Sequence, residues 1–177
     1  MQNISKKDIK INNNFRFILL SDTHGYLNPN IFNLVQESDY VFHAGDIMDI
    51  NIINNLQSAC KNVFAVNGNN DSYNKLVDVV AVNTPVGKVM LTHGDKHYPD
   101  FHDSLRKSFP DAFLIIYGHT HHHVIDMAKK PYIINPGAAG QTRTHGGASC
   151  VIITNSDNSL SIELKKFKTN IGFINKA

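Results

Sequence analysis

Five short apolar runs in this chain each end in side chains that can bind a metal ion. The first run, residues 15–20, leads directly into Ser21-Asp22-Thr23-His24-Gly25. A buried carboxylate costs several kcal/mol unless it is paired or coordinates a metal. In a lone Asp-x-His motif the two side chains usually form local hydrogen bonds within a turn. Here the same pattern, an apolar run followed by metal-binding side chains, recurs at four later runs, which end in Asp46, in Asn69, in His93, and in His119 with His121. This repetition predicts strands whose carboxyl ends share one site.

The order of the predicted elements is that of an α/β fold. Strands at 15–20, 40–43 and 62–66 alternate with two helices, one beginning at Asn28-Pro29 and one covering 52–59. This order predicts parallel pairing with crossover helices. Further strands are expected at 79–82, 88–92, 113–117, 123–127, 132–135, 148–154 and 160–167, with a short helix near 101–109. We expect one domain over 1–177, in which 1–14 is a polar extension or a weak edge strand.

Composition excludes several function classes. The 177 residues carry a formal net charge of +2, which is too small to indicate a nucleic-acid or membrane surface. No apolar run approaches the ~20 residues of a membrane span. Cys60 and Cys150 lie far apart, beside apolar residues, and predict buried free thiols. We therefore expect a cytoplasmic protein, and the sequence leaves homo-oligomerisation open.

The seven side chains at the strand ends have the chemistry of a metal centre. Ligands of open α/β sheets bind beyond the carboxyl ends of the strands, so these side chains should converge. Imidazole, carboxylate and amide donors without thiolate suit manganese, iron, zinc, cobalt or nickel. Seven donors are too many for one such ion with open positions, but they fit two ions ~3.5–4 Å apart that share a carboxylate.

These residues resemble those of the calcineurin-like metallophosphoesterases. The blocks D-x-H, G-D, G-N-x-D, H-G and G-H-x-H occur in the order of that family, over roughly residues 15–145. The short length, residues 21–25, His43-Ala44-Gly45-Asp46 and Asn135-Pro136-Gly137 most resemble the small single-domain YfcE-like phosphodiesterases.

The resemblance implies a four-layer α/β/β/α sandwich of two mixed sheets, with a dinuclear site at the strand ends. It implies that Asp46 bridges two ions, with manganese expected first and zinc, iron, nickel or cobalt as alternatives. A hydroxide shared by both ions would attack phosphorus in line, which makes the expected function a metal-dependent phosphodiesterase acting on a small phosphoester. The implied ligands are Asp22, His24 and His121 for one ion, and Asn69, His93 and His119 for the other.

One position departs from the pattern of many family members. They carry a histidine directly after the G-N asparagine, where it can protonate the leaving oxygen, but this chain has Asn70. An amide is no general acid, a role typically worth 10²–10⁴-fold. The YfcE-like subgroup also lacks this histidine. We expect Asn70, a catalytic candidate beside Asp46, to hydrogen-bond a phosphate oxygen, and we expect Arg143 either to clamp a phosphate or to be a surface charge.

Other polar residues receive supporting roles. We expect His43 to support the site or to lie in the core, and Asp49 and Asp71 to orient ligands or cap a helix. The remaining histidines are expected to lie outside the site: His122 and His123 in solvent or packing, and His97, His102 and His145 on the surface.

A rival function comes from a different class. The same fold serves as a protein-binding scaffold in the retromer coat, with its metal site degraded. All seven ligand positions are present here, and buried ligands without metals would be costly to keep. The sequence therefore favours the enzyme.

Overall fold

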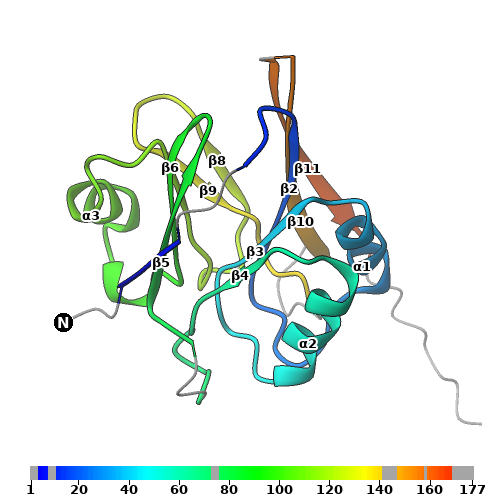
Figure 1. The fold of residues 1–177 in the computed structure, drawn as a ribbon. Coiled ribbons are helices and arrows are strands. Elements are labelled where there is room, and N and C mark those ends of the chain that lie inside the picture. The colour runs from blue at the N-terminus through cyan, green and yellow to red at the C-terminus, as the bar shows by residue number, and fades with distance from the viewer. Residues whose placement is uncertain (1–3, 8–10, 73–75, 141–146, 158, 169–177) are drawn as a thin grey trace, which may run out of the picture.

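The computed structural model describes residues 4–7, 11–72, 76–140, 147–157 and 159–168. These residues form two β-sheets that lie face to face, with helices on both outer faces (Figure 1). The arrangement is the predicted four-layer α/β/β/α sandwich, so the expected fold class is confirmed.

The first sheet has five strands in the order β11-β10-β2-β3-β4. Its strands β2, β3 and β4 are parallel and are connected through helices α1 and α2, as the alternation in the sequence predicted. Strand β10 is antiparallel to both β2 and β11. The bounds are β2 Phe15–Leu20, α1 Pro29–Gln36, β3 Tyr40–His43, α2 Ile50–Ala59, β4 Val63–Ala65, β10 Ala148–Ser156 and β11 Ser159–Phe167.

The second sheet has six strands in the order β1-β5-β6-β7-β9-β8. Strands β6, β7 and β9 are parallel, so their carboxyl ends lie at one edge of the sheet. Strand β1 is an edge strand that runs parallel to β5. The bounds are β1 Ile4–Lys7, β5 Val79–Thr84, β6 Gly87–Thr92, the 3-10 turn η1 Asp95–His97, α3 Phe101–Ser108, β7 Leu114–Ile116, β8 Val124–Asp126 and β9 Tyr132–Asn135.

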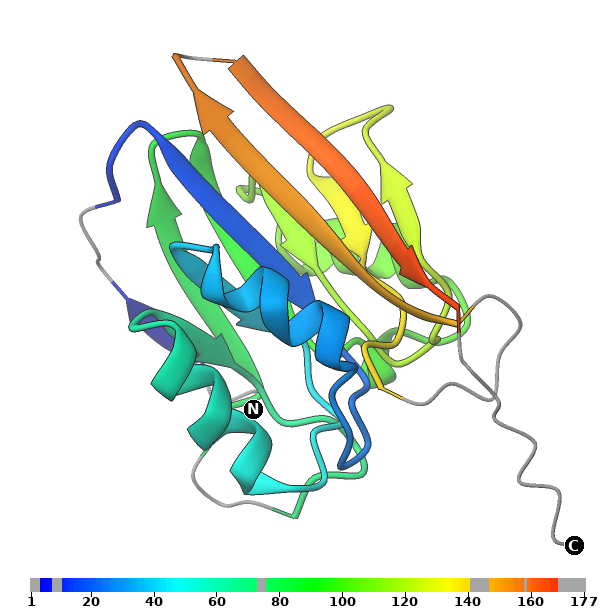
Figure 2. The same cartoon turned by 90° about the vertical axis from the view of Figure 1, so that its right-hand side faces the viewer.

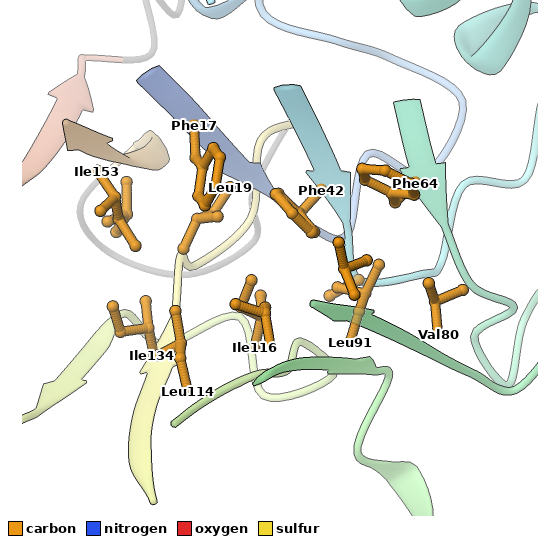
Figure 3. Close-up of a cluster of buried hydrophobic side chains, with 14 of the residues drawn as sticks. Phe17, Leu19, Phe42, Phe64, Val80, Leu91, Leu114, Ile116, Ile134 and Ile153 are labelled. Carbon is orange, nitrogen blue, oxygen red and sulfur yellow. The ribbon is translucent and has the colours of Figure 1, made fainter. Parts of the chain in front are cut away.

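Apolar side chains fill the space between the two sheets (Figure 3). Phe17 and Leu19 on β2 point toward the other sheet, where Leu91 and Ile116 point back at them. All four are at most 1% exposed. Complete burial of such a side chain contributes roughly 1.5–3 kcal/mol, so this layer holds the sheets together and fixes the spacing between their strand ends.

The opposite faces of the sheets are covered by helices (Figure 2). Side chains of a strand alternate between faces, so Ile18 of β2 packs in the cluster formed with Ile31 of α1 and Leu56 of α2. On the other sheet Ile115 packs in a cluster with Leu105 of α3. Because strands β2 and β7 are buried on both faces, they read as apolar runs in the sequence, interrupted only by the partly buried Arg16 of β2.

The helix starts follow from local chemistry. The Asn28 side chain accepts a hydrogen bond from the backbone N–H of Asn30 at 2.9 Å, and Pro29 occupies the first helical position of α1. Asp49 caps α2 in the same way, accepting from the N–H of Asn51 at 2.9 Å. Both helices cover the predicted ranges. The turn η1 was not predicted, because its three residues, Asp-Lys-His, carry no apolar periodicity.

Two further expectations can be compared with the structure. Cys60 and Cys150 are both buried and free, as predicted. Burial raises the pKa of the Cys150 thiol to about 12, which keeps it protonated. Among the described residues, none of the helices combines the length and apolarity that crossing a membrane requires.

Candidate metal centre

The carboxyl ends of five strands bring the seven predicted ligands together. Strands β2, β3 and β4 of one sheet lead into the segments that carry Asp22, His24, Asp46 and Asn69, and strands β6 and β7 of the other lead into His93, His119 and His121 (Figure 1). The sheets meet here through a hydrogen bond in which the backbone N–H of His119 donates to Oδ2 of Asp22, at 3.1 Å.

One group consists of Asp22, His24, Asp46 and His121. One potential ligand atom from each lies within 4.8 Å of all the others. The Nε2 atoms of His24 and His121 are 3.1 Å apart, and Nε2 of His121 is 3.3 Å from Oδ1 of Asp22. Two imidazoles and two carboxylates that converge in this way can surround a divalent cation.

A second group lies beside the first. Oδ1 of Asn69 is 3.0 Å from Nε2 of His93 and 3.0 Å from Nδ1 of His119. The other ring nitrogen of His93 is 2.7 Å from the carbonyl oxygen of Ala44. This contact makes Nδ1 the protonated nitrogen of a neutral ring, so that Nε2 presents its lone pair to the site.

Asp46 lies between the two groups. Its Oδ2 is 3.7 Å from Nε2 of His24, and its Oδ1 is 3.5 Å from Nε2 of His93. Asp46 is 2% exposed. Burial alone would raise the pKa of this carboxyl, but His93 and two hydrogen bonds from Asn70 hold the pKa of Asp46 well below its usual range. The carboxylate is therefore ionised and presents one oxygen to each group.

The electrostatics of the site favour positive charge. Burial works to lower the pKa of His93, but the Asp46 and Asp22 carboxylates outweigh it and raise that pKa. The pKa of His121 is raised chiefly by its contact with Asp22. Acidic side chains that raise the pKa of nearby imidazoles would equally attract divalent cations.

The backbone at the site adopts an uncommon conformation. Five of the seven predicted ligands have positive φ angles between 45° and 67°, a region that non-glycine residues rarely occupy. These residues are Asp22, His24, Asp46, His119 and His121. Such a conformation costs of order 1–3 kcal/mol per residue and persists where the surroundings enforce it, often at functional sites.

Two glycines allow the loops to approach closely. A Cβ atom on Gly68 would overlap the carboxylate of Asp46, and one on Gly118 would overlap Oγ of Ser21. Gly68 directly precedes Asn69, and Gly118 directly precedes His119. At these two positions any larger residue would clash with a neighbouring loop.

Supporting residues fix the loops. Oδ1 of Asp71 accepts from the N–H groups of Ile47 and Met48, and its Oδ2 accepts from the N–H of Gly68. Asp71 thus ties the Asp46 loop to the Asn69 loop, while Asp49 caps α2.

Two buried side chains hold neighbouring loops. His43 is fully buried, with Nε2 3.1 Å from Oγ1 of Thr23, and burial lowers its pKa to about 4. The sequence analysis assigned no role to Asn135, yet it is fully buried and donates to the carbonyl oxygen of Gly118 at 2.7 Å. The sequence does carry a signal for Asn135, because it is a polar residue at the end of the apolar strand β9.

The residues present fit metal ions. Asp22 is fully buried, and its Oδ1 accepts no hydrogen bond from any described residue. Its polar neighbour is Nε2 of His121, at 3.3 Å. A buried carboxylate oxygen without a hydrogen bond is costly, and a cation at this point would satisfy it. The oxygen and nitrogen donors match the ligand preferences of first-row transition metals.

Other candidates lie outside the two groups. Asn70 donates from its side-chain amide to Oδ2 of Asp46 at 2.7 Å. His122 and His123 are exposed. Arg143 and His145 lie outside the described residues, so the phosphate clamp expected of Arg143 stays a prediction.

The expectation that His97 lies on the surface is wrong. His97 is 5% exposed. It ends the turn η1, which begins after Gly94 in a left-handed conformation and directs the ring inward, against Phe109 and Ser104. His102 is half-buried, with ring nitrogens 3.2 Å from the Tyr117 hydroxyl and 3.4 Å from Asp126.

Comparisons with known proteins agree with this geometry. Residues 15–158 match the family model of the calcineurin-like phosphoesterase superfamily domain. Phosphodiesterase MJ0936 of Methanocaldococcus jannaschii is 28% identical over 138 residues, which cover 67% of this chain and 81% of that protein.

Two solved structures show the same fold. Vacuolar protein sorting 29 of Cryptosporidium parvum has a TM-score of 0.73 and 21% identity, covering 88% of this chain and 98% of that one. A predicted phosphoesterase of Streptococcus pneumoniae has a TM-score of 0.70 and 23% identity, covering 86% and 90%. At these identities the two structures bear on the fold alone.

Proposed function

Because the chain belongs to the calcineurin-like phosphoesterase superfamily, we propose that it is a metal-dependent phosphodiesterase that hydrolyses a small phosphoester. The observation that carries the proposal is the position of Asp46. One of its oxygens faces His93, and the other faces His24. A carboxylate shared in this way between two donor groups is what a two-metal site requires.

The proposed ligands follow the two groups. Asp22, His24 and His121 would hold one ion, Asn69, His93 and His119 the other, and Asp46 would contact both. Two divalent cations, when bound, would lower the pKa of a water molecule and neutralise negative charge on the phosphoryl oxygens. Manganese among the candidate ions, and a cytoplasmic location, stay predictions from the sequence.

The chain's own residues would set the geometry of the reaction. Asp71 holds the Asp46 and Asn69 loops in fixed register, and Asn135 holds the turn that begins at Gly118. Such pre-positioning reduces the cost of bringing water and phosphorus into line. Asn70 offers a neutral amide, not an acid, so the leaving oxygen would depart without a proton from position 70. This favours diesters with good leaving groups.

A non-catalytic scaffold is the competing function, because the fold is shared with vacuolar protein sorting 29. Two features support the enzyme. All seven ligand positions carry donor side chains, and Asp22 and Asp46 are at most 2% exposed. Burying two carboxylates is costly unless cations compensate them.

Hydrolysis after metal exchange tests the proposal. Protein stripped by a chelator and reloaded with Mn²⁺, Zn²⁺, Ni²⁺ or Co²⁺ should hydrolyse bis(p-nitrophenyl) phosphate, and the stripped protein should not. The monoester p-nitrophenyl phosphate should react more slowly. Protein that holds metal yet cleaves neither ester with any of these ions would instead support the scaffold.

A further inference from the structure

A pocket lies between the N-terminal halves of helices α1 and α2, which are side by side on the outer face of the five-stranded sheet (Figure 2). Its volume is about 400 Å³, within the ~300–1,000 Å³ typical of small-ligand sites. The lining residues include Pro29 and Phe32 of α1, and Asn51, Ile52 and Asn55 of α2. We call this space the α1–α2 pocket.

The α1–α2 pocket adjoins the candidate metal centre through two ligand loops. Its lining residue Gly25 directly follows His24. On the other loop, its lining residue Asp49 follows shortly after Asp46. The two loops touch where Sδ of Met48 is 3.1 Å from Nδ1 of His24. A Cβ atom on Gly25 would meet nothing within 4 Å, so open space begins one residue beyond a proposed ligand. A molecule held at the metal centre could therefore extend into the pocket.

Aromatic and aliphatic side chains form one part of the pocket wall. They are Tyr26, Leu27, Pro29, Phe32 and Ile52. Tyr26 is 41% exposed and Phe32 is half-buried, so a ligand can reach both side chains. Aromatic side chains bind flat rings by stacking, and every nucleobase offers such a face. This part of the wall suits a flat ring.

Polar side chains form the other part of the wall. Asn51 and Asn55 are four residues apart on α2, so they are neighbours on one face of the helix, and both are exposed. Each carboxamide can donate and accept hydrogen bonds. Oδ1 of Asp49 accepts from the backbone N–H of Asn51 at 2.9 Å, and the second oxygen of a carboxylate can accept from a ligand. Together these groups match a ring whose edge carries both donors and acceptors.

The charge of the pocket disfavours a second phosphate. Among the described residues that line it, Asp49 is the one with a charged side chain. An anion would meet this carboxylate without a lining cation to compensate the repulsion. An aliphatic chain would cover the amides of Asn51 and Asn55 without replacing their hydrogen bonds to water. A neutral planar heterocycle fits both the apolar wall and the polar wall.

We propose that the α1–α2 pocket binds a neutral planar heterocycle, such as a nucleobase, on the organic group that stays attached to phosphorus, so that the enzyme prefers nucleoside phosphodiesters. The inference rests on the proposed phosphodiesterase function. Tyr26 is then a specificity residue that stacks on the ring, and Asn51 and Asn55 bind its edge. All three contact the organic group and not the reacting phosphorus.

A set of p-nitrophenyl phosphodiesters tests this preference. All share one leaving group, and the second arm is the 5′-oxygen of 1-O-methylribose, uridine or adenosine, so that the arms differ only by the base. With Mn²⁺-loaded protein, kcat/KM for a nucleoside ester should exceed that for the methylribose ester about 10-fold, as one stacked ring provides. A gain with either base supports the proposal, and equal values for all three esters would overturn it.

Matched variants locate the effect. Tyr26→Ala removes the proposed stacking ring, so the ratio of nucleoside to methylribose ester should fall toward unity, whereas Tyr26→Phe keeps the ring and should keep most of the ratio. Asn55→Ala should lower the ratio about 3-fold through the loss of one hydrogen bond. Asn54→Ala, at the neighbouring exposed position outside the lining, should leave it unchanged. Melting temperatures check that each variant folds. An unchanged ratio in Tyr26→Ala would overturn the proposal.

Binding separates this inference from the proposed function. In calorimetry on the Mn²⁺-loaded parent, adenosine 5′-monophosphate should bind more tightly than ribose 5-phosphate, which lacks the base, and Tyr26→Ala should reduce the difference. If no diester is cleaved but this pattern holds, the phosphodiesterase proposal fails and the pocket assignment stands. If diesters are cleaved and the two monoesters bind equally, the pocket assignment fails alone.

Discussion

Asn70 holds both carboxylate oxygens of Asp46. Its backbone N–H donates to Oδ1 at 2.9 Å, and its side-chain amide donates to Oδ2 at 2.7 Å. Asn70, at the position where the sequence analysis noted a departure from the family pattern, therefore orients the candidate bridging carboxylate. This contact leads to two predictions.

The first prediction concerns metal affinity. Asn70→Ala removes the side-chain hydrogen bond to Asp46, and loss of a partner that orients a ligand typically weakens metal binding 10- to 100-fold. Competition with a chromophoric chelator measures this change. Asn54→Ala, at an exposed position of α2, is the control and should leave affinity unchanged. Parental affinity in Asn70→Ala would show that the backbone contact alone orients Asp46.

The second prediction concerns the leaving group. Asn70→His introduces an imidazole of pKa near 6.5, which can donate a proton to the departing oxygen. The rate should then depend less steeply on leaving-group pKa, and monoester hydrolysis should rise relative to the parent. Asn70→Gln keeps an amide and is the matched control. A parent enzyme that already cleaves alkyl monoesters as fast as nitrophenyl diesters would contradict this account of Asn70.

The third prediction separates four neighbouring histidines. His119→Ala or His121→Ala should lower turnover by more than about 100-fold, beyond the range typical of supporting residues, because each removes a proposed ligand. His122→Ala and His123→Ala should retain most of the activity, since both side chains are exposed. Rates at saturating metal, with melting temperatures to check folding, provide the comparison. Equal losses in all four variants would refute the ligand assignment.

The fourth prediction is a pH dependence of stability. Burial lowers the pKa of His43 from 6.5 to about 4. Between these values the unfolded chain binds a proton at His43 that the folded chain does not, so the free energy of unfolding falls as the pH falls. From pH 7 to pH 5 this contribution is about 2 kcal/mol.

Urea unfolding at several pH values, with a chelator present, measures this pH dependence of the free energy of unfolding. His43→Gln cannot ionise and can still contact Thr23, so its stability should fall less over this pH range than that of the parent. Because other histidines titrate in both proteins, the difference between the two is the informative quantity. An identical pH dependence would mean that His43 takes up a proton in the folded state.

Much of the fold was predictable because its signals are local. Strand β2 is an apolar run with the observed bounds, Phe15–Leu20, and α1 begins where the Asn28-Pro29 cap predicted. The ligand positions were predictable for the same reason, because each follows its strand directly. The convergence of the ligands on the first sheet followed from the parallel order of β2, β3 and β4, which places their carboxyl ends at one edge.

Other features depend on tertiary contacts that no local pattern encodes. The positive φ angles of Asp22 and His119 arise where loops from two sheets meet. His97 follows two charged residues, Asp95 and Lys96, in the sequence, and only its packing against Phe109 reveals that it is buried. The bond from Asn70 to Asp46 joins loops 24 residues apart. In each case the partner is distant in sequence, so periodicity and spacing carry no signal.

Metal stoichiometry tests the central claim, which is that Asp46 joins two ions in one site. Protein equilibrated with saturating Mn²⁺ and freed of loosely bound metal should contain two ions per chain by elemental analysis. Asp46→Asn should weaken both sites together, because it removes the shared negative charge. Asp49→Asn makes the same change at the cap of α2, where asparagine serves equally well, and should retain both ions. One ion or none in the parent, or two tightly held ions in Asp46→Asn, would contradict the account.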